Sequence, residues 1–146
     1  MIGVILIDDA PVARDYLAAT LDSDAEILVL HSAAAVEEVM GILPSPTVGV
    51  VVVGYHPPTS NGLDIATRVR SVRGVPVVLV HHGWAGTEAA SDDLAAQPQA
   101  VGIAGVLRSP LGMGRAAQAG FGRALRAAVR QAPAAMAAQM CRAAAR

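Results

Sequence analysis

Short apolar runs recur along the chain, and each one ends at a polar or glycine-containing segment. The runs are Met1–Ile7, Ile27–Leu30, Val48–Val53, Val75–Val80 and Ile103–Arg108. An unbroken apolar run of this length is typical of a strand buried on both faces, as in a parallel sheet covered by helices. The pattern therefore predicts five strands.

Helical spacing of apolar residues fills the intervals between these runs. It extends over Pro11–Leu21, over Ser32–Leu43 with Ser32 as the expected N-cap, and over Leu63–Val69. Strands that alternate with helices of this length imply crossover connections and a parallel sheet. We expect an α/β fold in which a five-stranded parallel sheet is doubly wound, forming three α/β/α layers.

The last part of the chain is rich in alanine and arginine. A final helix is predicted over Leu111–Gln131, and Pro133 is expected to end it. The sequence therefore suggests one domain over residues 1–131 and a tail over residues 132–146 that is either helical or disordered. Between Gly83 and Gly102 we expect a fourth helix that is short, displaced or mobile.

Bulk composition sets further limits. A chain of 146 residues is large enough for one domain with a single core. Although 53% of its residues are hydrophobic, no apolar stretch approaches the ~20 residues that cross a bilayer. No basic segment precedes the first apolar run, so we expect a cytoplasmic protein without membrane contact.

Charge is distributed unevenly along the sequence. All twelve acidic residues lie at or before Asp93, whereas the seven arginines from Arg108 onward face no acidic residue in that part of the chain. The segment from Arg108 onward, called the basic tail below, can contact nucleic acid or an acidic membrane surface. It can also lie against the chain's own acidic part or solvate an alanine-rich helix. Nucleic acid is disfavoured because the tail lacks interleaved aromatic residues.

The residues at the predicted strand ends follow an order and spacing that can be compared with known families. Asp8 and Asp9 follow the first strand, Gly54 follows the third, His81 ends the fourth, and Ser109 and Pro110 follow the fifth. Pro58 and Asn61-Gly62-Leu63 lie at fitting distances after Gly54. In order and spacing, residues 2–131 resemble a response-regulator receiver domain.

The resemblance implies a receiver that lacks the residues needed for phosphorylation. In that family the first-strand acids and an acceptor aspartate bind Mg²⁺, and the acceptor takes a phosphoryl group in the presence of a Thr or Ser and a Lys. Here Gly54 stands in the acceptor position, His81 in the Thr/Ser position and Ser109 in the lysine position, and the chain contains no lysine. Attack on phosphorus needs an anionic oxygen, and Mg²⁺ needs several oxygen ligands.

The histidines suggest a different use for the same sheet edge, where ligands bind in folds of this type. Asp8, Asp9, His56 and His81 would offer the nitrogen and oxygen ligands that Zn²⁺ or Ni²⁺ accepts. His82 is expected to point to the opposite face. Alternatively, the histidines are fillers that hydrogen-bond to nearby backbone.

The sequence gives no positive case for an enzyme. The loop after the first strand has two acidic residues and no glycine where a dinucleotide phosphate would need backbone donors. No nucleophile elbow, Cys-x-x-Cys or His-Glu-x-x-His motif is present.

We therefore expect a phosphorylation-independent pseudo-receiver that binds a signalling protein, such as a histidine kinase, a chemotaxis component or another regulator, or a second copy of itself. The resemblance places partner contacts around the fourth helix, fifth strand and fifth helix, where Trp84, Val106 and Arg115 lie. Two alternatives stay open: a small metal- or ligand-binding protein, and a transcription-linked regulator that uses the basic tail.

Overall fold

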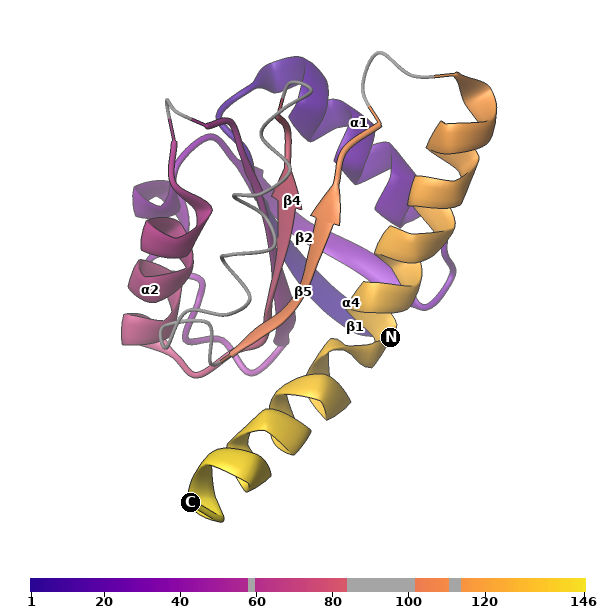
Figure 1. Ribbon diagram of the computed structural model, residues 1–146. Coiled ribbons are helices and arrows are strands. Elements are labelled where there is room, and N and C mark those ends of the chain that lie inside the picture. The colour runs from indigo at the N-terminus through magenta and orange to yellow at the C-terminus, as the bar shows by residue number, and fades with distance from the viewer. Residues whose placement is uncertain (58–59, 84–101, 111–113) are drawn as a thin grey trace.

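Five parallel strands form the centre of the molecule. The computed structural model describes residues 1–57, 60–83, 102–110 and 114–146. Its elements are β1 (Ile2–Ile7), α1 (Pro11–Asp22), β2 (Ile27–Ala33), the 3₁₀ turn η1 (Val36–Val39), β3 (Val48–Tyr55), α2 (Gly62–Val72), β4 (Val77–His81), β5 (Ile103–Arg108) and α4 (Arg115–Ala144). Figure 1 shows their arrangement.

The strand order is β2-β1-β3-β4-β5, and every neighbouring pair is parallel. The chain moves outward from β1 to β2 and then crosses back to β3, so the order reverses between β1 and β3. In sheets of this kind, the crevice at such a reversal is where ligands bind. The predicted doubly wound α/β fold is confirmed.

Helices cover both faces of the sheet, as Figure 1 shows. One core cluster joins the sheet to α2 and η1, and the other joins it to α1 and α4. Successive residues of a strand enter opposite clusters, as Val4 and Leu6 do on one face and Ile5 and Ile7 on the other. The three predicted layers are therefore present.

Strand β3 shows why these residues form a central strand. Its four valines from Val50 to Val53 are fully buried, and β-branched side chains pack well on a pleated surface. Burying one such side chain contributes about 1.5–3 kcal/mol relative to leaving it exposed. The strand continues through Gly54 to Tyr55, two residues beyond the predicted end, which brings Gly54 to the carboxyl edge of the sheet.

The helix predicted over Ser32–Leu43 was wrong. Strand β2 extends to Ala33, and only the 3₁₀ turn η1 follows it. The carboxylate of Glu38 accepts hydrogen bonds from the backbone N–H groups of Ala34 (2.8 Å) and Ala35 (2.9 Å), which starts the turn after Ser32. The short turn buries Val36 and Val39, two of the apolar residues whose spacing predicted a helix.

The expected stop at Pro133 was also wrong, because α4 continues through it. Proline costs a helix interior about 3 kcal/mol relative to alanine, but the residues around it are mostly alanine, the strongest helix former. The side chain of Gln139 further anchors this half: it accepts from the N–H of Gly102 (3.0 Å) and donates to the carbonyl of Ile103 (2.8 Å).

The C-terminal turns of α4 reach beyond the sheet in Figure 1. Of the two possibilities left open for residues 132–146, the helical one is therefore observed over most of their length. Across the described residues, α4 included, no helix combines the length and the apolar character that a membrane span requires.

Candidate functional site

Asp8 is the centre of the crevice at the end of β1. Its side chain is fully buried. Its backbone N–H donates to the carbonyl of Ala33 (3.0 Å), and its own carbonyl accepts from the guanidinium of Arg14 (2.8 Å). Its Oδ1 accepts from the N–H of Ala10 (2.9 Å). Strand β2 and the start of α1 therefore fix the position of this carboxylate.

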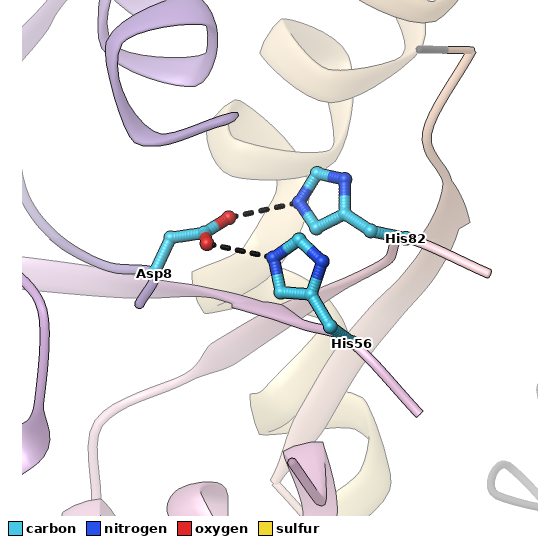
Figure 2. Close-up of side chains that lie close together, drawn as sticks. All are labelled: Asp8, His56 and His82. Atoms are coloured by element: carbon cyan, nitrogen blue, oxygen red, sulfur yellow. Dashed lines mark hydrogen bonds and ion pairs between the residues drawn. The ribbon is translucent and has the colours of Figure 1, made fainter. Parts of the chain in front are cut away.

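Two imidazoles meet the carboxylate from neighbouring strand ends, as Figure 2 shows. The Nε2 of His56 lies 2.9 Å from Oδ1 of Asp8, and the Nε2 of His82 lies 2.8 Å from Oδ2. The rings are stacked, with centroids 4.5 Å apart and planes 12° from parallel. Because an ionised carboxylate only accepts hydrogen bonds, each Nε2 in this arrangement carries the hydrogen.

The charge state of Asp8 follows from its surroundings. Burial raises the pKa of its carboxyl group, but the hydrogen bonds from His82, His56 and the Ala10 amide outweigh burial and hold the pKa below its ordinary value of 3.8. Asp8 is therefore an anion at neutral pH. A buried anion needs such partners, since an unpaired one is costly.

Gly54 borders this cluster. A Cβ atom at position 54 would lie 1.9 Å from Oδ2 of Asp8 and 2.9 Å from Nε2 of His82. Neither distance is compatible with a side chain at this position unless the carboxylate moves. The space that a residue in this position would use is therefore filled by Asp8 and His82.

The expectation that His81 lines the crevice was wrong. His81 lies on the opposite face of the sheet, fully buried, with its ring edge-to-face against Tyr55 at 5.2 Å. Tyr55 and His81 are paired in register, and the N–H of His82 donates to the carbonyl of Tyr55 (2.9 Å). His56 and His82 follow this pair, so alternation places both on the other face.

The remaining predicted residues lie at or near this edge in different roles. Asp9 is half exposed, and its Oδ1 lies 3.6 Å from Nε2 of His56. The N–H of Ser109 donates to the carbonyl of His81 (2.9 Å), and Pro110 is buried. Ser109 and Pro110 both line a hollow between β5 and α4.

Two of the three expected partner-binding residues lie in the part of the chain that the structure describes, and they lie on opposite faces of the sheet. Val106 is partly buried and packs against the core on the α2 side. Arg115 is exposed and begins α4, which covers the other face of the sheet. Trp84 lies outside the described residues.

Part of the basic tail lies against the acidic part of the same chain. Arg126 of α4 donates to the carbonyl of Thr20 (3.3 Å) and to the hydroxyl of Ser23 (3.1 Å). Arg130 pairs with Asp24. These contacts hold α4 against the C-terminal end of α1. Contact with the chain's own acidic part is one of the uses that the sequence suggested for the arginines.

Comparison with known proteins gives two groups of relatives. No protein-family model matches the chain. Among curated proteins, the chain is similar to a protein-glutamate methylesterase/protein-glutamine glutaminase of Nitrosospira multiformis, with 31% identity over 80 residues, which is 55% of this chain and 22% of that protein. A protein of the same name from Rhizobium etli is 32% identical over 91 residues, which is 60% of this chain and 26% of that protein. The chain thus spans about a quarter of the length of these relatives.

Solved structures match nearly the whole chain. The response regulator domain of Thermotoga maritima CheB superposes with a TM-score of 0.70 at 21% identity, covering 91% of this chain and 96% of that domain. A response regulator receiver domain from Clostridium thermocellum gives 0.65 at 18% identity, covering 91% and 94%. This chain has the receiver fold.

His82 is the residue of this receiver-fold crevice that sequence reasoning missed. In the structure, alternation along β4 puts His82 on the same face as Val78 and Val80. The sequence shows no apolar–polar alternation there, since β4 is buried on both faces. The facing of His82 follows only when β4 is set in register against Tyr55 and the rest of β3.

Proposed function

We propose that this chain is a pseudo-receiver, a regulatory module that acts by docking to another protein without being phosphorylated. The main observation behind this proposal is that no free space remains beside Gly54 for an acceptor side chain. The residue at the expected acceptor position has no carboxylate, and Asp8 and His82 fill the space where one would stand. The receiver fold supplies the scaffold, and the crevice lacks the group that phosphoryl transfer requires.

Asp8 is a poor substitute for the missing acceptor. Both of its oxygens already accept hydrogen bonds, Oδ1 from His56 and Ala10 and Oδ2 from His82, and the side chain is fully buried. Attack on phosphorus requires an oxygen that is free and aligned with the leaving group. The chain also has no lysine to pair with a bound phosphoryl group.

We infer a regulatory rather than a catalytic role. The similarity to CheB is to its response regulator domain, which this chain matches over nearly the whole length of both. The partner we propose is a signalling protein, such as a histidine kinase, a chemotaxis component or another regulator, or a second copy of this chain. Light scattering over a range of protein concentrations separates these two cases, because only self-association changes the mass of the isolated chain.

Phosphorylation is tested with acetyl phosphate and Mg²⁺, followed by intact-mass spectrometry of the wild type and of Gly54→Asp. A receiver that retains its aspartate and lysine is the positive control. We expect the control to gain the mass of one phosphoryl group and the wild type to gain none. We also expect none for Gly54→Asp, since Asp8 and His82 occupy the space that its side chain needs.

Two results would count against these statements in different ways. A phosphorylated wild type would overturn the pseudo-receiver proposal. Phosphorylation of Gly54→Asp alone would leave that proposal standing, because the wild type lacks the acceptor, but it would show that the crevice can rearrange to admit a carboxylate.

A further inference from the structure

We propose that Asp8, His56 and His82 form a binding site for a divalent transition-metal ion of the zinc type. One ligand atom from each of these residues lies within 4.8 Å of the other two. This site requires neither a protein partner nor a phosphoryl group, so it goes beyond the docking role proposed above. It also differs from the set expected from the sequence, because His82 replaces His81.

The sheet positions the three ligands. Asp8 follows β1, His56 follows β3 and His82 follows β4, and these strands are neighbours in the order β1-β3-β4. Ser60 holds the backbone of His56 in place. The N–H of His56 donates to the hydroxyl of Ser60 (2.7 Å), and the carbonyl of His56 accepts from the N–H of Ser60 (3.0 Å). A site held by three adjacent strand ends needs little backbone ordering when the ion binds.

Glycine at position 54 makes this convergence possible. A side chain there would collide with both Oδ2 of Asp8 and Nε2 of His82. Only a residue without a Cβ atom lets the carboxylate and the imidazole meet at this point. The same glycine therefore accounts for two features of the site. It brings no carboxylate to the acceptor position, and it leaves room for Asp8 and His82 to meet.

The burial of the three ligands is graded, and His56 is the one that solvent reaches most. Asp8 and His82 are 0% and 4% exposed, whereas His56 is 25% exposed. Asp9 stands at the outer edge, with Oδ1 3.6 Å from Nε2 of His56. An ion can enter past His56, and Asp9 or water can complete a four-coordinate shell around three protein ligands.

Metal binding requires a small rearrangement of the rings and, at each ligating Nε2, a change of tautomer that moves the hydrogen to Nδ1 and leaves a lone pair for the ion. An ion lies in the plane of an imidazole that ligates it, and two rings that are 12° from parallel cannot both meet that condition. His56 is the ring that can tilt, because it is the more exposed one and lies beyond the last residue of β3. The amide of Ala10 continues to hold Oδ1 of Asp8, as an outer partner that orients a ligating carboxylate.

The donor set selects the class of metal. Two imidazole nitrogens and one carboxylate oxygen suit Zn²⁺, Co²⁺ or Ni²⁺. Mg²⁺ prefers an octahedron of oxygen ligands and is bound weakly by such a set. Excess Mg²⁺ is therefore expected not to displace the bound ion.

The test uses the purified, untagged chain after removal of metals with a chelator, without any phosphoryl donor. Zn²⁺ is titrated by calorimetry, and Co²⁺ is added separately to follow its visible absorption. We expect one Zn²⁺ per chain, a rise in the thermal midpoint with Zn²⁺, and Co²⁺ bands of a nitrogen- and oxygen-ligated site.

Three variants locate the site. His56→Ala and His82→Ala are expected to weaken Zn²⁺ binding by at least ~10-fold, because the loss of even an outer partner of a metal ligand costs ~10–100-fold in affinity. His31→Ala is the matched control, because His31 is exposed on β2 at the far edge of the sheet from β4. It should bind Zn²⁺ as the wild type does.

The outcomes are decisive even if His82→Ala does not fold. His56 is partly exposed, so His56→Ala is expected to keep the wild-type far-ultraviolet circular dichroism and to carry the test alone. The proposal is overturned if the wild type binds no Zn²⁺, if His56→Ala binds it as tightly as the wild type, or if His31→Ala loses it to the same extent.

Discussion

A methyl group at position 54 is the smallest change that probes the crevice. Gly54 is buried at the carboxyl end of β3, and the atom that alanine would add has no space beside Asp8 and His82. At this position glycine serves close approach rather than an unusual backbone angle, because its φ is not positive.

We predict that Gly54→Ala lowers the free energy of unfolding by about 1–3 kcal/mol, because overpacking forces neighbours out of their preferred positions. Urea denaturation followed by circular dichroism measures the change. Gly74→Ala is the matched control, since a Cβ atom there would meet nothing within 4 Å and the residue is exposed. Its unfolding free energy should stay within about 0.5 kcal/mol of the wild type. Equal effects of the two substitutions would contradict the described packing around Gly54.

Helix α4 extends well beyond the end that the sequence predicted for it. It spans 30 residues and crosses Pro133. The proposed division between residues 1–131 and 132–146 stays a prediction, but Gln139 connects the two parts by bonding the backbone at the start of β5. The second half of α4 is thus tied to the edge strand of the sheet rather than only to the helix that precedes it.

Gln139→Ala is predicted to lower the free energy of unfolding by about 1–3 kcal/mol, because two backbone groups near the start of β5 lose their partner. Gln131→Ala is the matched control on the same helix, since Gln131 is exposed. Chemical denaturation gives the stability. Hydrogen exchange gives a local readout, in which the amide of Gly102 should exchange faster in Gln139→Ala only. Unchanged exchange at Gly102 would mean that Gln139 does not hold this edge.

For the whole molecule, folding brings the two charged parts of the sequence together. Helix α4 carries arginines of the basic tail onto α1, where Arg126 and Arg130 bond to Thr20, Ser23 and Asp24. The Arg130–Asp24 contact is an ion pair, and a surface pair of this kind contributes little to stability. It offsets the charge of Arg130, whereas Arg126 keeps its charge because its acceptors on Thr20 and Ser23 are neutral.

We therefore predict weak retention on heparin, with elution at a salt concentration well below that needed to release a protein that makes many phosphate contacts. The double substitution Arg142→Ala and Arg146→Ala removes two exposed arginines near the C-terminus and should change the elution only slightly. Strong, salt-resistant retention that this double variant abolishes would instead favour the transcription-linked alternative.

Predictions from the sequence were most accurate for the strands. The range Ile103–Arg108 was predicted as β5 and is observed, because an apolar run between turn residues has few alternatives in a parallel sheet. The predictions failed in two places. The hydrogen bonds to Glu38 favour the turn η1 over a helix after Ser32. The alanines around Pro133 and the contacts of Gln139 together outweigh the helix-breaking tendency of the proline.

The sequence alone determined the class of fold, the absence of an acceptor carboxylate at Gly54 and the presence of acids and histidines at the strand ends, because composition and periodicity are local properties of the chain. Only the tertiary structure decided that His82, rather than His81, meets Asp8 and His56. The reason is that β4 is buried on both faces, so its hydrophobic pattern does not show which residues point to which side of the sheet. The register of β4 against β3, fixed by cross-strand pairing between residues far apart in the chain, sets which histidine turns toward the crevice.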